Sequence, residues 1–368
     1  MHHTKRHHIG VTSAAILIAA AALLVGLLAR RPVLGGVGAA GWLVLPLVGC
    51  GWQPSAPIPP DTTPSATPTP RPTASPTSTS GATATPTAAP SPQPLLAVDD
   101  FCYQLQAADL QAIARSAFDM VVIDYSSTGD AHGEYTAAQI ASLRANPAQP
   151  KIVLSYLSIG EAEDYRFYWH EGWAPGNPAW LDAENPDWGG NYKVRYWDPA
   201  WRGIVMAYLD RILDAGYDGV YLDIIDAYEY YFERGRASAP AEMAALVGAI
   251  RDHAHARAPG FVIVVQNAPE LAEIVPGYMA LVDGIGQEDI YYGYEEDDVA
   301  TPSEDTQWLE GHLDRYVAAH KLVLTIDYCT TPAHIDDAYA RSAARGYVPY
   351  CTVRDLDQLT VNPGHEPD

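Results

Sequence analysis

Short apolar runs alternate with helix-like segments along residues 95–368 of this chain. The apolar runs are continuous and are not interrupted at every second position by polar residues, which is the pattern of parallel strands buried on both faces. We predict eight strands, within residues 101–105, 118–123, 151–156, 218–223, 261–265, 281–286, 322–326 and 347–351. Strands that alternate with helices imply helical crossovers, so eight such units predict an α/β fold with a single (β/α)8 TIM barrel.

Helical patterns separate most of these strands. The predicted helices cover residues 136–144, 199–215, 240–256, 303–320 and 332–344. Thr136 stands at an N-cap position and Pro199 in a first helical turn, where these residue types are favoured. No GxGxxG motif follows the first strand, which argues against an open nucleotide-binding sheet.

Acidic and amide residues mark the ends of six of the eight predicted strands. A charged group at the end of a buried strand is costly unless it is paired, and in TIM barrels the active site lies at the C-terminal strand ends. Any one of these residues could merely cap the helix that follows it. As a set, they predict a functional site at one end of the barrel. They are Asp124, Glu161, Asp223, Gln266 with Asn267, Glu288 and Asp327.

An aromatic-rich insertion lies between the third and fourth predicted strands. It holds Trp169, Trp173, Trp180, Trp188, Trp197 and Trp201, with Tyr165, Tyr168, Tyr192 and Tyr196 among them. Aromatic surfaces with a polar edge, close to acids, suit a sugar ligand, and a protonated amine on that sugar would also gain from the ring faces. The alternative is that the insertion packs a small aromatic core of its own.

The charge balance is strongly acidic. The chain has 22 Lys and Arg against 45 Asp and Glu, a formal net charge of −23, and only one of these acids precedes residue 95. Such a surface repels nucleic acid and attracts a neutral or cationic partner. After Cys50, the cysteines are Cys102, Cys329 and Cys351, and their spacing matches no zinc or redox motif, so we expect no metal and no cofactor.

Residues 1–50 have the composition of a signal or anchor segment. Two apolar runs flank Arg30 and Arg31, and the second ends in Leu-Val-Gly-Cys50, which resembles a bacterial lipobox. We therefore expect Cys50 to be lipidated. The alternative is an uncleaved membrane helix formed by the first apolar run.

Residues 51–94 are rich in Pro, Thr, Ser and Ala, which predicts a disordered linker. The expected localisation of residues 95–368 is extracytoplasmic, with the N-terminal anchor as the only membrane contact. In that environment we expect a Cys329–Cys351 disulfide, because both residues fall near the C-terminal ends of neighbouring strands.

Five stretches of the sequence resemble the endo-α-1,4-polygalactosaminidase-like proteins, which form glycoside hydrolase family 114 with their archaeal and bacterial relatives. The resemblance implies a (β/α)8 barrel that cleaves an α-1,4-linked polysaccharide containing galactosamine or N-acetylgalactosamine. The matching stretches are residues 103–106, 155–166, 185–188, 191–197 and 219–228.

Glycosidic cleavage needs one carboxyl that donates a proton and one carboxylate that acts as nucleophile or base. From their strand positions we expect Asp223 to be the nucleophile and Glu288 the acid/base, although the two roles could be reversed. The sequence does not decide whether cleavage retains or inverts the configuration at the anomeric carbon, or whether it is endo or exo. The expected substrate-binding residues are Asp124, Tyr156, Glu161, Tyr165, Arg166, Asp226, Gln266, Asn267, Asp327, Tyr328, Trp188 and Trp197.

Two other functions compete with this hypothesis. A non-catalytic carbohydrate-binding lipoprotein on a degenerate barrel would keep the aromatic residues and lose the acid pair. An aldolase- or isomerase-like barrel would need a Gly-rich phosphate-binding loop after the seventh or eighth strand, and residues 327–330 and 352–354 contain none. We expect a monomer whose partner is a polysaccharide and not a nucleic acid.

Overall fold

The computed structural model describes residues 95–145 and 150–368. The expectations for residues 1–50, for Cys50 and for the linker at 51–94 lie outside the described residues. Within the described ranges, no helix is both long enough and apolar enough to span a membrane.

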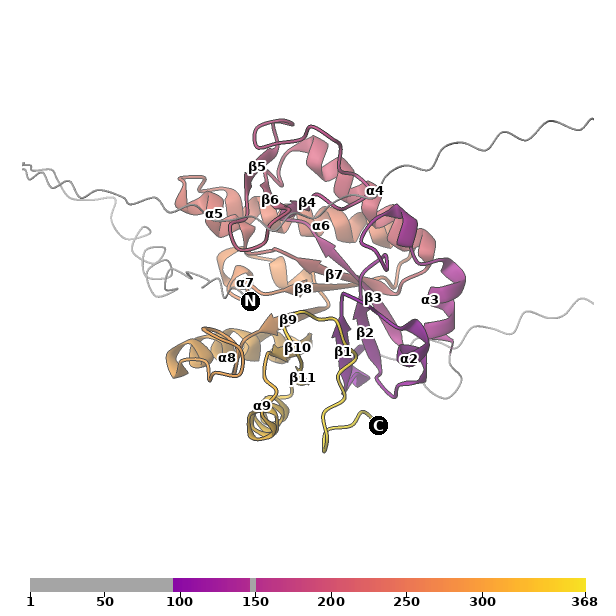
Figure 1. Cartoon of the computed structure of the whole chain (residues 1–368). Helices are drawn as coiled ribbons and strands as arrows, with labels where there is room; N and C mark the ends of the chain where they lie inside the picture. Colours follow the sequence, from indigo (N-terminus) through magenta and orange to yellow (C-terminus); the bar gives the residue numbers. More distant parts are fainter. Residues whose placement is uncertain (1–94, 146–149) are drawn as a thin grey trace, which may run out of the picture. The chain divides into compact units, whose positions relative to one another are not determined.

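Eight parallel strands form one sheet in the order β1-β2-β3-β7-β8-β9-β10-β11 (Figure 1). Each strand pairs in parallel with its neighbour in this order. The strands are β1 (Phe101–Gln104), β2 (Met120–Ile123), β3 (Ile152–Ser158), β7 (Gly219–Asp223), β8 (Val262–Gln266), β9 (Gly284–Glu288), β10 (Leu322–Asp327) and β11 (Val348–Cys351). This arrangement confirms the predicted (β/α)8 barrel.

The first and last strands meet at a seam. The ring of Phe101 on β1 lies 5.5 Å from that of Tyr350 on β11. Beyond the strand ends, the backbone N–H groups of Leu105 and Gln106 donate to the carbonyl oxygen of Leu356, at 2.9 and 3.0 Å. The segment that follows β11 therefore closes the barrel at its C-terminal end.

The helices form where local capping and hydrophobic patterns favour them. Thr136 makes a capping box with Gln139 at the start of α3, and Pro199 begins α4, which ends at Gly216 with φ of 81°. The short helices α2, α5 and α7 were not predicted, because they span too few residues for a clear period. The helices are α2 (Leu110–Arg115), α3 (Ala137–Arg144), α4 (Pro199–Ala215), α5 (Ala227–Glu233), α6 (Ala239–Arg257), α7 (Leu271–Ile274), α8 (Ser303–Ala318) and α9 (Pro332–Arg345).

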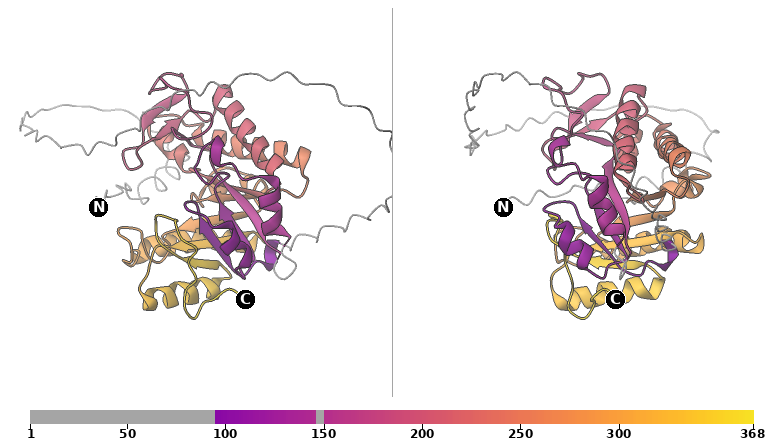
Figure 2. Two further views of the ribbon diagram at one scale, coloured as in Figure 1. Left: turned by 45° about the vertical axis from the view of Figure 1, so that its right-hand side comes forward. Right: turned by 90° about the vertical axis from the view of Figure 1, so that its right-hand side faces the viewer.

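The insertion after β3 folds into a small antiparallel sheet in the order β4-β6-β5. Its strands are β4 (Glu161–Glu163), β5 (Leu181–Glu184) and β6 (Asn191–Val194). This sheet lies beside α4 and on the opposite side of the barrel from α9 (Figures 1 and 2).

Four tryptophans of this region pack against one another. Trp173 lies 5.3 Å from Trp169 and 5.0 Å from Trp180, and Trp180 lies 5.1 Å from Trp201, as distances between ring centroids. For these four residues the aromatic-core interpretation holds. Trp188 differs, because 49% of its surface is exposed.

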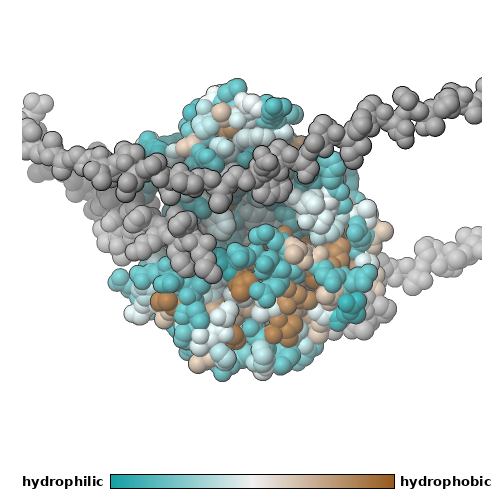
Figure 3. Space-filling model, viewed as in Figure 1, coloured by the Kyte–Doolittle hydropathy of each residue, from teal (hydrophilic) through white to brown (hydrophobic). Residues whose placement is uncertain are grey.

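The described surface is mostly hydrophilic on the face shown in Figure 3, with apolar residues gathered in its lower half. Cys102, Cys329 and Cys351 are buried free thiols. The predicted Cys329–Cys351 disulfide is therefore absent. The neighbouring Cys329 thiol and, next, burial raise the pKa of the Cys351 thiol.

Candidate active site

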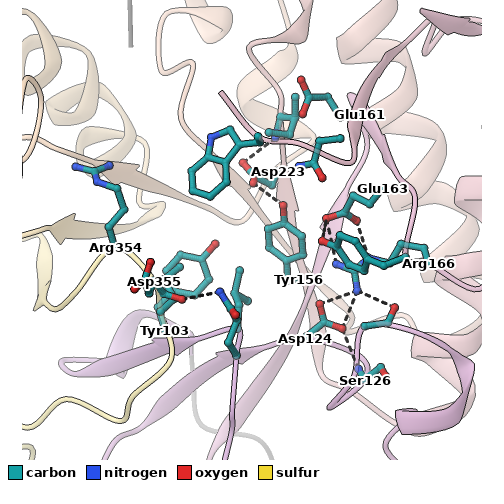
Figure 4. A pocket seen from close by; sticks show the side chains of 18 of the residues that line it. Tyr103, Asp124, Ser126, Tyr156, Glu161, Glu163, Arg166, Asp223, Arg354 and Asp355 are labelled. Carbon is teal, nitrogen blue, oxygen red and sulfur yellow. Dashed lines mark hydrogen bonds and ion pairs between the residues drawn. The ribbon is translucent and has the colours of Figure 1, made fainter. Parts of the chain in front are cut away.

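A cavity of about 530 Å³ opens at the C-terminal ends of the barrel strands. Its walls come from the ends of β1, β2, β3, β7 and β9, from the loop after each of β8 and β10, from the insertion and from the segment after β11. Figure 4 shows Tyr156 pointing at Asp223 near the centre of this cavity, with Arg166 between Glu163 and Asp124 to one side.

Asp223, the last residue of β7, is held by two donors. The hydroxyl of Tyr156 donates to Oδ2 at 2.7 Å, and the backbone N–H of Ile224 donates to Oδ1 at 2.7 Å. Burial and, next, the charge of Glu288 raise the pKa of Asp223 to about 7, and the two donors oppose this rise. The carboxyl can therefore gain or lose a proton close to neutral pH.

Glu288, the last residue of β9, is held by neutral donors from the neighbouring strand ends. The hydroxyl of Tyr328 donates to Oε1, and Asn267 Nδ2 donates to Oε2 at 3.0 Å. Oδ1 of Asn267 in turn accepts from Gln287 Nε2 at 3.0 Å and from the backbone N–H of Glu288 at 3.1 Å. Asn267 is thus fixed on both sides and orients the Glu288 carboxyl.

The backbone takes the same unusual turn at three consecutive strand ends. Ile224, Asn267 and Asp289 directly follow β7, β8 and β9, with φ of 59°, 60° and 59°. Asn and Asp tolerate this left-handed conformation, but for a β-branched residue such as Ile224 it costs about 1–3 kcal/mol. The strained residues Ile224 and Asp289 directly follow Asp223 and Glu288 in the chain, so the strain lies beside these two acids.

Arg166 is a buried cation shared by two acids. Its Nη1 donates to both carboxylate oxygens of Asp124, at 2.9 and 2.7 Å, and its Nε donates to Glu163 Oε2 at 2.6 Å. Tyr165 donates its hydroxyl to Glu163 Oε1 at 2.5 Å. Burial raises the pKa of Asp124, while the guanidinium opposes the rise. This network forms one wall of the cavity.

Glu161 on β4 is also paired. Lys193 Nζ on β6 and Asn185 Nδ2 both donate to its Oε1, at 3.1 and 3.0 Å. Burial raises the pKa of Glu161, and Lys193 lowers it. Glu161 and Lys193 are partners across β4 and β6, so this ion pair lies within the insertion sheet, on its cavity side.

Most of the predicted site residues lie together. The cavity is lined by both predicted catalytic acids and by nine of the predicted binding residues: Asp223, Glu288, Asp124, Tyr156, Glu161, Tyr165, Arg166, Trp188, Asp226, Asn267 and Tyr328. Tyr165 and Trp188 are the exposed aromatic residues among them, at 46% and 49%.

Three predicted binding residues do not line the cavity. Gln266 is buried inside the barrel and accepts from the Tyr221 hydroxyl. Asp327 accepts the backbone N–H groups of Tyr291 and Tyr292, at 2.7 and 2.9 Å. Trp197 packs between Tyr231, at 4.7 Å between ring centroids, and the Arg236 guanidinium, at 3.6 Å. These three side chains lie outside the cavity lining, and their contact with a substrate stays a prediction.

Sequence reasoning missed several cavity residues. Glu163 stands two residues after Glu161, within a stretch that had already been singled out. Arg354 follows the eighth barrel strand, and its guanidinium stacks over the Tyr328 ring at 4.0 Å and pairs with Asp289 at 3.0 Å. Its position after a strand end was the signal that could have identified it. Tyr103 on β1 also lines the cavity, and it stands in residues 103–106, another of the matching stretches.

The described residues contain one group of acids spaced closely enough to hold a metal ion. It consists of Asp99, Asp100 and Asp368, none of which lines the cavity. Asp99 and Asp100 precede β1 and so lie at the N-terminal end of the barrel.

Comparison with known proteins gives a family match and structural neighbours. The model of glycoside-hydrolase family GH114 matches residues 77–366. An uncharacterized protein of Deinococcus radiodurans is 42% identical over 253 residues, covering 69% of this chain and 79% of the relative. One of Thermotoga maritima is 36% identical over 286 residues, covering 73% and 85%.

Two solved structures share the fold. The glycoside hydrolase domain of PelA from Pseudomonas aeruginosa has a TM-score of 0.54 at 23% identity, covering 72% of this chain and 97% of that domain. Aspergillus fumigatus Ega3 in complex with galactosamine has a TM-score of 0.53 at 19% identity, covering 74% and 96%. At these identities, the likeness concerns the fold.

Proposed function

The chain belongs to glycoside-hydrolase family GH114, and on this basis we propose that it hydrolyses an α-1,4-linked polysaccharide containing galactosamine or N-acetylgalactosamine. Family membership makes it a glycosidase. The amino-sugar substrate is supported by the acidic cavity and by the galactosamine complex of Ega3, whose fold this chain shares.

The observation that carries the proposal is the pair formed by Asp223 and Glu288. Both carboxyls line the cavity, each accepts a tyrosine hydroxyl, and the charge of Glu288 raises the pKa of Asp223. Asp223 can therefore be present with or without its proton near neutral pH, beside a second carboxyl in the same cavity. Glycoside hydrolysis by two carboxyls uses such a pair.

In the proposed mechanism, Asp223 is the nucleophile. Its carboxylate attacks the anomeric carbon while Glu288 gives its proton to the departing glycosidic oxygen, which yields a glycosyl-enzyme ester and a shortened chain. Glu288 then takes a proton from water, and the resulting hydroxide displaces Asp223 from the anomeric carbon. The product keeps the configuration of the substrate, as in retaining glycosidases.

The test is incubation of the protein with partly deacetylated α-1,4-galactosaminan, with products read by mass spectrometry. Wild-type protein should release oligosaccharides, whereas Asp223→Asn and Glu288→Gln should lose turnover by orders of magnitude and keep affinity. Asp252→Asn, at an exposed acid of α6, is the matched control. Binding without any product would favour the non-catalytic carbohydrate-binding alternative.

We also propose that residues 1–50 anchor the protein to the membrane outside the cytoplasm and that it acts as a monomer. The apolar runs and the lipobox ending at Cys50 support the anchor. A polymer outside the cell is then within reach of the catalytic domain, if residues 51–94 act as the linker that their composition predicts.

A further inference from the structure

The acids that line the cavity differ in how their charge is compensated. Asp124 and Glu163 share Arg166, and Glu161 pairs with Lys193. Every oxygen of these two carboxylates already accepts from Arg166 or from Tyr165. Cations of the chain itself therefore neutralise this side of the cavity.

Asp226 is different. It lines the cavity from the turn between β7 and α5, three residues after Asp223, and it is partly buried. Among the described residues, no side-chain donor or cation bonds to its carboxylate, and although it stands at the N-cap of α5, its side chain caps no backbone N–H. Its charge instead raises the pKa of Asp223 and of Glu161.

A carboxylate among like charges, with no cation, is electrostatically unfavourable. A cation supplied by the ligand would offset this cost and would gain a charge-assisted hydrogen bond. In a galactosamine unit the ammonium is carried by C2, the neighbour of the anomeric C1 that Asp223 attacks. The group that binds this ammonium must therefore lie in the same cavity near the nucleophile, and Asp226, three residues after Asp223, lines that cavity.

We propose that Asp226 binds the C2 ammonium of the galactosamine unit positioned against Asp223, and so makes the enzyme select free-amine over N-acetylated units at this subsite. The inference rests on the proposed function and assigns its amino-sugar specificity to one side chain. N-acetylation removes the positive charge and leaves Asp226 facing a neutral amide, so an acetylated unit gains no ion pair.

The test compares two matched α-1,4-linked oligosaccharides, one of galactosamine and one of N-acetylgalactosamine. Wild-type protein should show the higher kcat/KM for the free-amine form. Asp226→Asn should lower kcat/KM for that form by about tenfold and leave the acetylated form within about twofold, because one charge-assisted contact is lost. Asp226→Glu, which retains the charge, should keep much of the preference.

Glu233→Gln is the matched control, since Glu233 is an exposed acid of α5 that does not line the cavity. It should leave the ratio of the two kcat/KM values unchanged. Equal losses on both substrates in Asp226→Asn, or an unchanged ratio, would overturn the assignment. Unfolding curves of Asp226→Asn are expected to show no loss of stability, because in the described part of the chain this side chain makes no cap hydrogen bond and its charge lies among like charges.

Binding provides a readout that does not depend on turnover. Calorimetric titration with the two oligosaccharides should show tighter binding of the free-amine form to wild type, and this difference should shrink in Asp226→Asn. If wild type binds but cleaves neither oligosaccharide, the proposed reaction is wrong while the binding data still decide the role of Asp226. If cleavage is normal and the selectivity of the variant is unchanged, only the Asp226 assignment fails.

Discussion

The hydroxyl of Tyr156 donates to Oδ2 of Asp223 at 2.7 Å and so joins the ends of the neighbouring strands β3 and β7. This bond stabilises the ionised carboxyl, against burial and against the charge of Glu288, which together raise the pKa of Asp223 to about 7. The hydroxyl therefore acts on the protonation of the proposed nucleophile as well as on its position.

Replacing this hydroxyl should shift the pH dependence of activity. Tyr156→Phe removes a donor to the anion, so the pKa of Asp223 should rise and the acidic limb of kcat/KM should move to higher pH by roughly one unit. The pH–rate profile measures the shift.

Tyr339→Phe is the control, because Tyr339 does not line the cavity. If the acidic limb of kcat/KM does not move in Tyr156→Phe, Asp223 is not the group that must be ionised.

The raised pKa of Asp223 also predicts a pH-dependent cost in stability. Between its ordinary value of 3.8 and about 7, the folded protein holds a proton that the unfolded chain has lost, so this group's contribution to stability decreases as pH rises through that window. Asp223→Asn removes this cost. At pH 8 the free energy of unfolding of Asp223→Asn should exceed that of wild type by about 2 kcal/mol. This is about half of the free energy that corresponds to the full pKa shift, because water in the cavity screens the carboxylate.

Urea unfolding at pH 8 and pH 4.5 measures this effect. At pH 4.5 the advantage of Asp223→Asn should largely vanish, because the wild-type carboxyl is then protonated in the folded state. Asp252→Asn provides the comparison for an exposed acid. If Asp223→Asn were more stable than wild type by the same amount at both pH values, ionisation of Asp223 would not be the cause.

Arg166 should be essential for stability, because it compensates two buried acids. Arg166→Met leaves Asp124 and Glu163 without their cation and should lower the free energy of unfolding by about 3–5 kcal/mol. The triple variant Asp124→Asn, Glu163→Gln and Arg166→Met should recover much of that loss. Chemical denaturation at pH 7 distinguishes the two, and a triple variant as unstable as the single one would count against the charge argument.

Arg354 should act on catalysis through Tyr328. Its guanidinium stacks over the Tyr328 ring, whose hydroxyl donates to Glu288. Arg354→Met should lower kcat by about tenfold with little change in KM, because the proposed acid/base loses its fixed position. Asp297→Asn is the control, because Asp297 Oδ1 accepts from Arg354 Nε at 2.6 Å and the change leaves the Arg354 guanidinium itself in place. This variant should lower kcat much less than Arg354→Met. Equal losses in the two variants would indicate general loosening of the loop.

The membrane anchor can be tested through Cys50. Labelling with a palmitate analogue should be lost in Cys50→Ala, and the protein should leave the membrane fraction, because a lipoprotein is held in the membrane by its acyl chains. Unchanged membrane retention without label in this variant would favour an uncleaved helix in residues 1–50.

The positions of Asp223 and Glu288 could be predicted because strand ends meet at one face of a barrel. What could not be predicted was the register between neighbouring strands. Glu288 pairs with Ile326, so Asp327, one residue further along, faces the opposite side of the sheet, where it accepts backbone N–H groups. Gln266 pairs with Gly286, two residues before Glu288, and so faces the barrel interior below the cavity.

The insertion was a harder case for sequence reasoning. Its composition indicated aromatic surfaces, but composition does not distinguish a ring that binds sugar from one that packs in a core. Trp188 lines the cavity, whereas Trp197 is enclosed by Tyr231 and Arg236. The difference depends on the turn between β5 and β6, which no local pattern specifies.

The described ends of the catalytic domain meet at the face of the barrel opposite the cavity. Residues 95–97 lead directly into β1, and the backbone N–H of Asp368 donates to Asp100 Oδ2 at 3.3 Å. A support or a fusion partner attached through either end would thus join the barrel away from the cavity mouth. Immobilised protein should keep its activity on long polymers, because the attachment point does not obstruct the approach of the substrate.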